Sequence, residues 1–330
     1  MNGSEPGVRP SFPRWVVWGF QIALTLAVTY FLFRSIRLSW SELADVDLAG
    51  WRPRALPFVA SCVVLLAVFV YLVGLWALMV RRLGGPRLGL GESMKIFFVA
   101  NLGRYVPGKV WQLAGLTYLA GKRGVSLPVA SSAAVLGQVF ALAAAATLGG
   151  IALAAGATSG FPSEFVPWAL VLAAVIVVVV TVPAALRMML RVAFKLGRRQ
   201  EDTPRLDALF GARWLGLYLV AWLGYGIAFG LLWGSFPALP AVSWPAAVGS
   251  FGGAYFLGYA AIFAPAGVGV REGAMAVLLS PWMGAADATV LAVIARIWMT
   301  VAELAPLALI AIAVALGLTD RNSRSEDHAI

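Results

Sequence analysis

The chain has 330 residues, of which 61% are hydrophobic and 12% are charged. Soluble domains carry about 25% charged residues, so this composition excludes a soluble fold and predicts an all-α polytopic integral membrane protein. The net charge of +10 does not indicate nucleic acid, because the cations lie between apolar runs, where they set topology and contact anionic headgroups. The single histidine, His328, lies in a polar tail, so we expect no histidine-based catalytic triad and no zinc site.

Six apolar runs are long enough to cross a bilayer as helices. The runs are Trp15–Phe33, Ala55–Val80, Leu127–Ala155, Val166–Leu186, Trp214–Ser235 and about Ala288–Leu318. The last run contains two charged residues, Arg296 and Glu303. A signal peptide is the alternative for the first run, but the run is too long and no small-residue cleavage site follows it. Gly226, Gly230 and Gly234 form a small-residue stripe in the fifth run, which predicts close helix packing.

Two further apolar segments, about 93–121 and 244–282, are interrupted. The first is broken at Tyr105–Lys109 and the second at Ala264–Gly273. One arm of each, Ser93–Gly103 and Gly273–Trp282, holds about half of the roughly 20 residues that a spanning helix needs. We therefore expect two opposed re-entrant hairpins and about six full transmembrane helices. The alternative is eight crossings, with each hairpin drawn as two full spans.

The distribution of Lys and Arg predicts the orientation. Cytoplasmic positions are expected for the N-terminus, the Arg81–Arg87 loop, Lys122-Arg123 and the Arg187–Arg213 linker. The first outer loop, Arg34–Arg54, fits poorly, because it carries four arginines against three acids. The expected layout is a cytoplasmic tail at 1–14, one transmembrane domain at 15–318 and a cytoplasmic tail at 319–330. Both termini then face the cytoplasm from an inner (plasma) membrane.

The linker begins with Arg187, Arg191 and Lys195 at four-residue spacing, with apolar residues between them. This pattern predicts a basic helix near anionic headgroups.

The segment from Asn101 to Trp111 matches most of a Walker A motif, with Gly103, Gly108 and Lys109 in register. Val110 stands where a Ser or Thr would hold magnesium, and no strand precedes the motif, so we expect no nucleotide. The same atoms suit a lipid phosphate, through backbone N–H groups, a helix N-terminus and two cations. The alternative is that Arg104 and Lys109 only form structural ion pairs with Glu272 or Glu303.

The second break is not a dinucleotide fingerprint, because its third glycine comes one residue late. In a membrane it is better interpreted as a hinge, with Pro265, Gly267 and Gly269, and Pro107 has the same role in the first break. Arg271 and Glu272 then lie at mid-depth and point about 100° apart, toward different partners.

Arg296 and Glu303 lie seven residues apart, two turns along one helix face. They can pair with Glu272 and with Arg271, Arg104 or Lys109. Intramembrane charges usually mark a functional site, so Glu272, Arg296 and Glu303 are candidates for a polar network that couples to protons. A static salt-bridge network is the alternative.

The two interrupted segments also carry a resemblance. Arg104-Tyr105-x-Pro107-Gly108-Lys109-x-Trp111 and Pro265–Glu272 are similar, in order and spacing, to the flippase-like membrane domain of lysylphosphatidylglycerol synthases. The resemblance implies re-entrant helices and movement of a lipid with an anionic or aminoacylated head between leaflets. The chain ends about a dozen residues after its last span, so we expect a stand-alone member without the aminoacyl-transferase domain.

The expected function is that of a lipid flippase for an anionic or aminoacylated phospholipid or a polyprenyl-phosphate-type amphiphile. Its predicted partners are membrane lipids, with no cofactor, metal, nucleotide or nucleic acid and no catalytic residue. The predicted headgroup-binding residues are Asn101, Arg104, Tyr105, Gly108, Lys109, Trp111 and Arg271. One alternative is a membrane-bound transferase acting on a polyprenyl carrier, for which Asp45 and Asp47 resemble a DxD pair. Another is a membrane subunit that serves a lipid-modifying enzyme.

Overall fold

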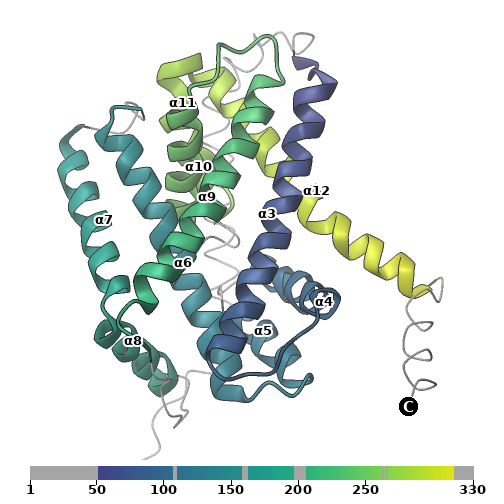
Figure 1. The fold of residues 1–330 in the computed structure, drawn as a ribbon. Coiled ribbons are helices and arrows are strands. Elements are labelled where there is room, and N and C mark those ends of the chain that lie inside the picture. The colour runs from purple at the N-terminus through teal and green to yellow at the C-terminus, as the bar shows by residue number, and fades with distance from the viewer. Residues whose placement is uncertain are drawn as a thin grey trace, which may run out of the picture.

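The computed structural model describes residues 51–106, 110–157, 163–196, 206–261, 264 and 267–315. Every regular element in these ranges is a helix, which confirms the all-α polytopic class (Figure 1). Four described helices are long and apolar enough to cross a membrane. They are α3 (Ala55–Arg82), α6 (Leu127–Ala154), α9 (Phe210–Gly234) and α12 (Ala285–Ala315). The expected first span, Trp15–Phe33, and the tails at 1–14 and 319–330 lie outside the described residues.

The sequence predicted one span over Val166–Leu186, but the structure shows two helices there. The short 3-10 turn η3 (Ser163–Phe165) precedes α7 (Val166–Thr181). The next helix, α8 (Pro183–Leu196), runs at 88° to α7. Proline fixes its own φ and has no N–H, so it suits the first position of a new helix. The two helices make a fifth crossing only if the bent pair counts as one span.

The first interrupted segment folds into two short helices. These are α4 (Leu90–Asn101) and α5 (Trp111–Gly121), with the 3-10 turn η2 (Leu102–Tyr105) between them. With 12 and 11 residues, each helix is only about 17 Å long, against about 30 Å for the hydrocarbon core. The two pack against each other and lie together in the lower half of the molecule in Figure 1.

The second interrupted segment forms α10 (Trp244–Ala260) and α11 (Val270–Met283), which pack side by side in the upper half. Its break is shorter than expected, because Arg271, Glu272 and Gly273 already belong to the first turn of α11. The two hairpins therefore enter the bundle from opposite ends, and the tip of each lies near the middle.

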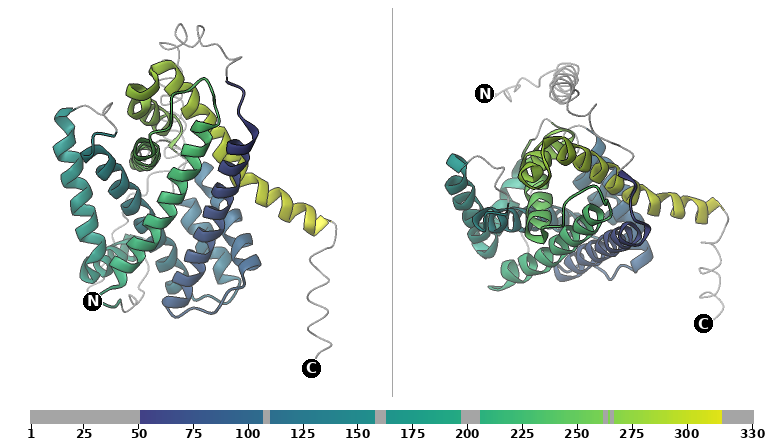
Figure 2. Two further views of the ribbon diagram at one scale, coloured as in Figure 1. Left: turned by 45° about the horizontal axis from the view of Figure 1, so that its top comes forward. Right: turned by 90° about the horizontal axis from the view of Figure 1, so that it is seen from above.

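Small residues bring the helices around the second hairpin into close contact. A Cβ added at Gly226 or Gly230 would come within 2.4 Å of Val248 or 2.5 Å of Trp244. Two glycines of the predicted stripe of α9, Gly226 and Gly230, therefore pack closely against α10. In Figure 2, α7 and α8 lie at the periphery of the bundle and α12 extends away from it at its C-terminal end.

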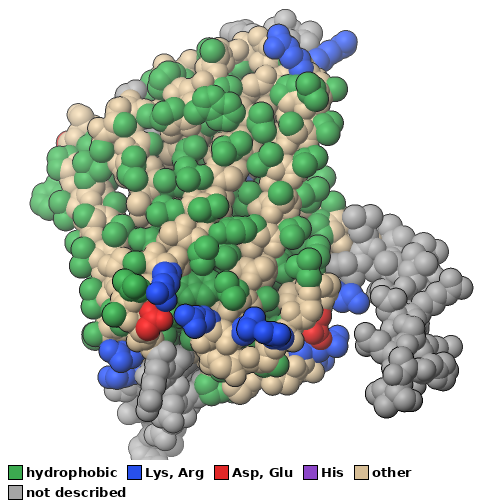
Figure 3. Space-filling model, in the orientation of Figure 1, with side chains coloured by type: hydrophobic (Ala, Val, Ile, Leu, Met, Phe, Trp, Pro, Cys, Tyr) green, Lys and Arg blue, Asp and Glu red, His purple; other side chains and the backbone are tan. Residues whose placement is uncertain are grey.

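Most basic side chains gather at the lower end of the molecule, below a broad apolar surface, and a smaller basic group lies at the upper end (Figure 3). The exposed cations at the lower end include Arg81, Arg82, Lys122, Arg123 and Arg213. Three of them form exposed ion pairs: Arg82 and Arg213 with Asp207, at 3.8 and 3.5 Å, and Arg123 with Glu92 at 3.0 Å. The first hairpin, α4–α5, begins and ends at this basic end.

Candidate functional site

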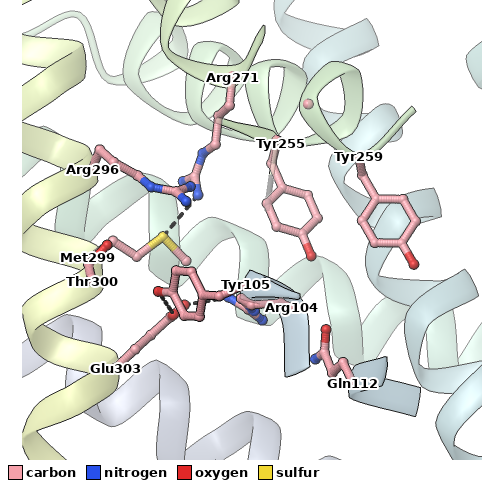
Figure 4. A pocket seen from close by; sticks show the side chains of 12 residues that line it. Arg104, Tyr105, Gln112, Tyr255, Tyr259, Arg271, Arg296, Met299, Thr300 and Glu303 are labelled. Carbon is pink, nitrogen blue, oxygen red and sulfur yellow. Dashed lines mark hydrogen bonds and ion pairs between the residues drawn. The ribbon is translucent and has the colours of Figure 1, made fainter. Parts of the chain in front are cut away.

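A polar cavity of about 40 Å³ lies where the tips of the two hairpins meet α12 (Figure 4). Arg104 and Tyr105 reach it from η2, and Arg271 reaches it from the first turn of α11. The lining is completed by Gln112 of α5, by Tyr255, Gly258 and Tyr259 of α10, by Gly267, and by Arg296, Met299, Thr300 and Glu303 of α12. Residues far apart in the sequence thus share one buried site.

Glu303 ties the tip of the first hairpin to α12. Arg104 Nη1 donates a hydrogen bond to Glu303 Oε1, and the Tyr105 hydroxyl donates to Oε2 at 2.9 Å. Glu303 is buried, so this charge-assisted contact lies in a low-dielectric environment. Both carboxylate oxygens therefore already have a partner from η2.

Glu272 and Arg296 form a second ion pair, between α11 and α12. Arg296 Nη1 lies 3.7 Å from Glu272 Oε1, and the other carboxylate oxygen of Glu272 accepts a hydrogen bond from the N–H of Gly269, the N-cap residue of α11. Capping satisfies an N–H group that the first turn of a helix would leave unpaired. Glu272 therefore helps to fix where α11 begins.

The turn before α11 depends on glycine. Gly267 and Gly269 have φ of 69° and 80°, in the left-handed region that glycine adopts without strain. A Cβ added at Gly258 would lie 2.8 Å from the Cβ of Arg271. The absence of a side chain at Gly258 thus allows α10 to approach the first turn of α11 and sets the position of Arg271.

Arg271 is the cation of the site that has no acidic counterpart. It is 6% exposed, and no carboxylate of the described residues lies within ion-pair distance of it. Its guanidinium instead contacts Met299 Sδ at 3.1 Å and lies 4.8 and 5.6 Å from the ring centroids of Phe251 and Tyr255. Cation–π contacts contribute about 0.5–2 kcal/mol each, well below what a buried charge loses on leaving water.

The cavity therefore has an excess of positive charge. Three arginines and one glutamate line it. When Glu272, the partner of Arg296, is counted as well, the described cations still outnumber the acids. An anion that enters the cavity would balance this charge. Arginine presents a planar fork of donors that matches the oxygens of a phosphate.

The structure brings together only part of the predicted headgroup-binding set. Arg104, Tyr105 and Arg271 line the cavity. Asn101 is buried and accepts a hydrogen bond of 2.6 Å from Gln112 Nε2. This bond joins the end of α4 to the start of α5. Trp111 does not line the cavity and is 51% exposed.

Four predicted site and hinge residues, Pro107, Gly108, Lys109 and Pro265, lie outside the described residues, as do Asp45 and Asp47.

Several lining residues were missed by sequence reasoning. Met299 and Thr300 lie three and four residues after Arg296 on the face that also carries Glu303, and Tyr255 and Tyr259 are one turn apart on α10. The three- and four-residue spacing of a helix face was the signal that could have identified them. The tyrosines give the cavity neutral hydroxyl groups beside its cations.

The arrangement defines the class of protein: a polytopic helical membrane protein with a buried cationic cavity between two opposed helical hairpins. The family model for the lysylphosphatidylglycerol synthase TM region matches residues 16–320, so the chain belongs to that family. A comparison with curated proteins finds no match. No cluster of three His, Cys, Asp or Glu side chains that could hold a metal ion occurs among the described residues.

Proposed function

We propose that the protein is a lipid translocase, which moves an anionic phospholipid or a polyprenyl-phosphate-type amphiphile between the leaflets of the inner (plasma) membrane. The observation that carries the proposal is Arg271, a buried cation without a carboxylate partner in a cavity where arginines outnumber glutamates. An intramembrane charge of this kind is costly unless a counter-charge offsets it. A phosphate group supplies that counter-charge, and membrane lipids are its source at this depth.

The route of the lipid follows from the position of the cavity. Arg104 lies at the tip of the hairpin from the basic end, whereas Arg271 lies at the tip of the hairpin from the other end. A phosphate held between them is reached from either leaflet when one hairpin moves against the other. Broken helices of this kind form the substrate sites of many transporters.

The lipid leaves with its covalent structure unchanged in this proposal. The sequence has no ATPase motif, so movement is downhill or coupled to an ion. Glu272 and Glu303 are the groups that would carry a proton. Each carboxylate forms an ion pair between a hairpin and α12, so its protonation would weaken that contact. The basic end faces the cytoplasm, and a lipid-modifying enzyme is a partner that could supply the substrate there.

Reconstituted vesicles test the proposal. Purified protein is placed in liposomes that contain phosphatidylglycerol with a fluorescent acyl chain, and a membrane-impermeant reductant then bleaches the label in the outer leaflet. Wild-type protein is expected to expose nearly all of the label over time. Arg271→Gln is expected to lower the translocation rate at least tenfold, because it removes the unpartnered charge without adding bulk.

The matched control is Arg123→Gln, which removes an exposed arginine at the basic end. It is expected to leave the rate within about twofold of wild type, since exposed ion pairs contribute little. Equal translocation rates for wild type and Arg271→Gln would refute the site, provided that size-exclusion chromatography shows both proteins to be folded. Absence of translocation by the wild type would refute the proposed function.

A further inference from the structure

The charged side chains at the cationic cavity form two pairs and leave one cation over. Glu303 is paired with Arg104, and Glu272 lies 3.7 Å from Arg296. Arg271 has no carboxylate of the described residues within ion-pair distance. The described lining, taken together with Glu272, thus holds three arginines and two glutamates, which gives a net charge of +1.

Neither carboxylate is free to neutralise Arg271. Both oxygens of Glu303 already accept hydrogen bonds from the tip of the first hairpin. One oxygen of Glu272 accepts the hydrogen bond from the N-cap of α11, and the other faces Arg296. Turning either carboxylate toward Arg271 would break these contacts and leave another arginine without its counter-charge, which is strongly destabilising in a buried site.

The rest of the described lining carries no charge. Apart from the arginines and Glu303, it consists of three tyrosines, two glycines, Gln112, Met299 and Thr300. Amide and hydroxyl groups donate hydrogen bonds to the oxygens of an anion, but they do not offset its charge. The negative charge of a bound anion is therefore balanced by Arg271 alone, as long as both pairs stay intact.

Lipid phosphates differ in the number of charges that they carry. A phosphodiester, as in phosphatidylglycerol or a polyprenyl phosphate that carries a sugar, has one negative charge. A phosphomonoester, as in phosphatidic acid or bare polyprenyl phosphate, loses a second proton at about pH 6 and has nearly two. The single charge neutralises Arg271. A second charge stays unbalanced, or it takes an arginine from Glu303 or Glu272 and leaves that carboxylate unpaired.

We propose that the cavity selects its ligand by charge and that its ligands are lipids with a phosphodiester group, in preference to phosphomonoesters. The inference rests on the proposed function, because it takes the phosphate of a membrane lipid as the partner of Arg271. It narrows the substrate class, since bare polyprenyl phosphate is disfavoured. The alcohol on the far side of the phosphate has no part in this selection, so phospholipids and phosphodiester-linked polyprenyl sugars both satisfy it.

The test compares two lipids that differ by one methyl group. Phosphatidylmethanol is a diester with one charge, whereas phosphatidic acid with the same acyl chains is a monoester with about two charges at about pH 8. Each lipid is added separately at that pH to the purified full-length protein in neutral detergent, and binding is measured by native mass spectrometry. Wild-type protein is expected to bind phosphatidylmethanol about tenfold more tightly, because the second charge of phosphatidic acid meets no free cation.

Three variants change the charge in a controlled way. Glu303→Gln raises the net charge of the described cavity by one, so it is expected to reverse the preference in favour of phosphatidic acid. Arg271→Gln lowers it by one and is expected to weaken the binding of both lipids. The matched control is Glu92→Gln, which alters the charge of the protein as Glu303→Gln does, but at a pair with Arg123 outside the cavity. It is expected to keep the wild-type preference.

The comparison in wild-type protein does not depend on the folding of any variant. Equal affinity for the two lipids, or tighter binding of phosphatidic acid, would overturn the inference, as would an unchanged preference in folded Glu303→Gln. A reversal in Glu92→Gln as well would assign the effect to the charge of the whole protein and not to the cavity. Binding does not require transport, so a protein that selects the diester but translocates no lipid refutes the proposed function and leaves the ligand class standing.

Discussion

Glu303 and Arg271 lie in the same cavity, but their charges are balanced differently. Glu303 has a partner on each carboxylate oxygen, whereas Arg271 has aromatic rings and a sulfur atom around it. The seven-residue spacing of Arg296 and Glu303 predicted that they share a face of one helix. The sequence offered Glu272 as the partner of Arg296 but left three cations open for Glu303, because that choice depends on where the hairpin tips lie. The structure pairs Arg296 with Glu272 and Glu303 with Arg104.

The pair between Arg104 and Glu303 gives a prediction at this scale. Glu303→Gln leaves Arg104 in the cavity without its counter-charge, and removal of one partner from a buried pair typically costs about 3–5 kcal/mol. We expect a lower thermal unfolding temperature in neutral detergent and a larger increase on addition of phosphatidylglycerol than wild type shows, because the phosphate replaces the lost carboxylate.

Glu92→Gln, which breaks the more exposed pair with Arg123, is the control and should change stability by less than about 1 kcal/mol. An identical response to phosphatidylglycerol in wild type and Glu303→Gln would contradict the account.

The helical elements follow from the sequence where length and composition decide them. Among the described residues, four of the long apolar runs became single helices, and the two interrupted runs became pairs of shorter helices. Proline was less informative. Pro183 begins α8 after a sharp bend, whereas Pro281 and Pro306 lie inside α11 and α12. Whether a proline ends a membrane helix depends on whether neighbouring groups satisfy the freed carbonyl, which a single sequence does not specify.

The contact between α10 and α11 gives a prediction at the element scale. Gly258→Ala places a methyl group 2.8 Å from Arg271 Cβ and about 3.3 Å from its backbone, so the two helices must separate. Overpacking of this kind costs about 1–3 kcal/mol. We expect a lower unfolding temperature and slower phosphatidylglycerol translocation, because Arg271 is displaced from the cavity.

Gly273→Ala, in the first turn of α11, is a matched control on the same hairpin. A Cβ at Gly273 meets nothing within 4 Å, so this variant should be as stable and as active as wild type. If Gly258→Ala also behaved like wild type, Gly258 would have no part in positioning Arg271.

At the scale of the whole molecule, the hairpins enter from opposite ends and their tips meet near the centre. The topology could be expected from the distribution of Lys and Arg together with the short hairpin arms. The cavity could not, because periodicity gives the faces of helices but not which faces converge. In the alternative with eight full crossings, each hairpin is two full spans, so its tip would lie at the opposite face of the membrane and not near the centre.

Thiol labelling of intact cells distinguishes the two arrangements. In a Cys62→Ala background, Ala285→Cys should react with a bulky membrane-impermeant maleimide from outside, and Lys122→Cys should react only after the cells are opened. Val106→Cys lies at the tip of the first hairpin and should resist the external reagent, because the tip ends near the middle of the molecule and does not reach the outer end. Rapid external labelling of Val106→Cys, at the rate of Ala285→Cys, would favour eight crossings.

The most direct test of the central claim is an experimental density map of the protein in nanodiscs that contain phosphatidylglycerol. The account predicts phosphate density in the cavity, within hydrogen-bond distance of the Arg271 and Arg104 guanidinium groups, and loss of that density in Arg271→Gln. A cavity that holds only water, with Arg271 still unpaired and lipid density confined to the outer surface of the bundle, would contradict it.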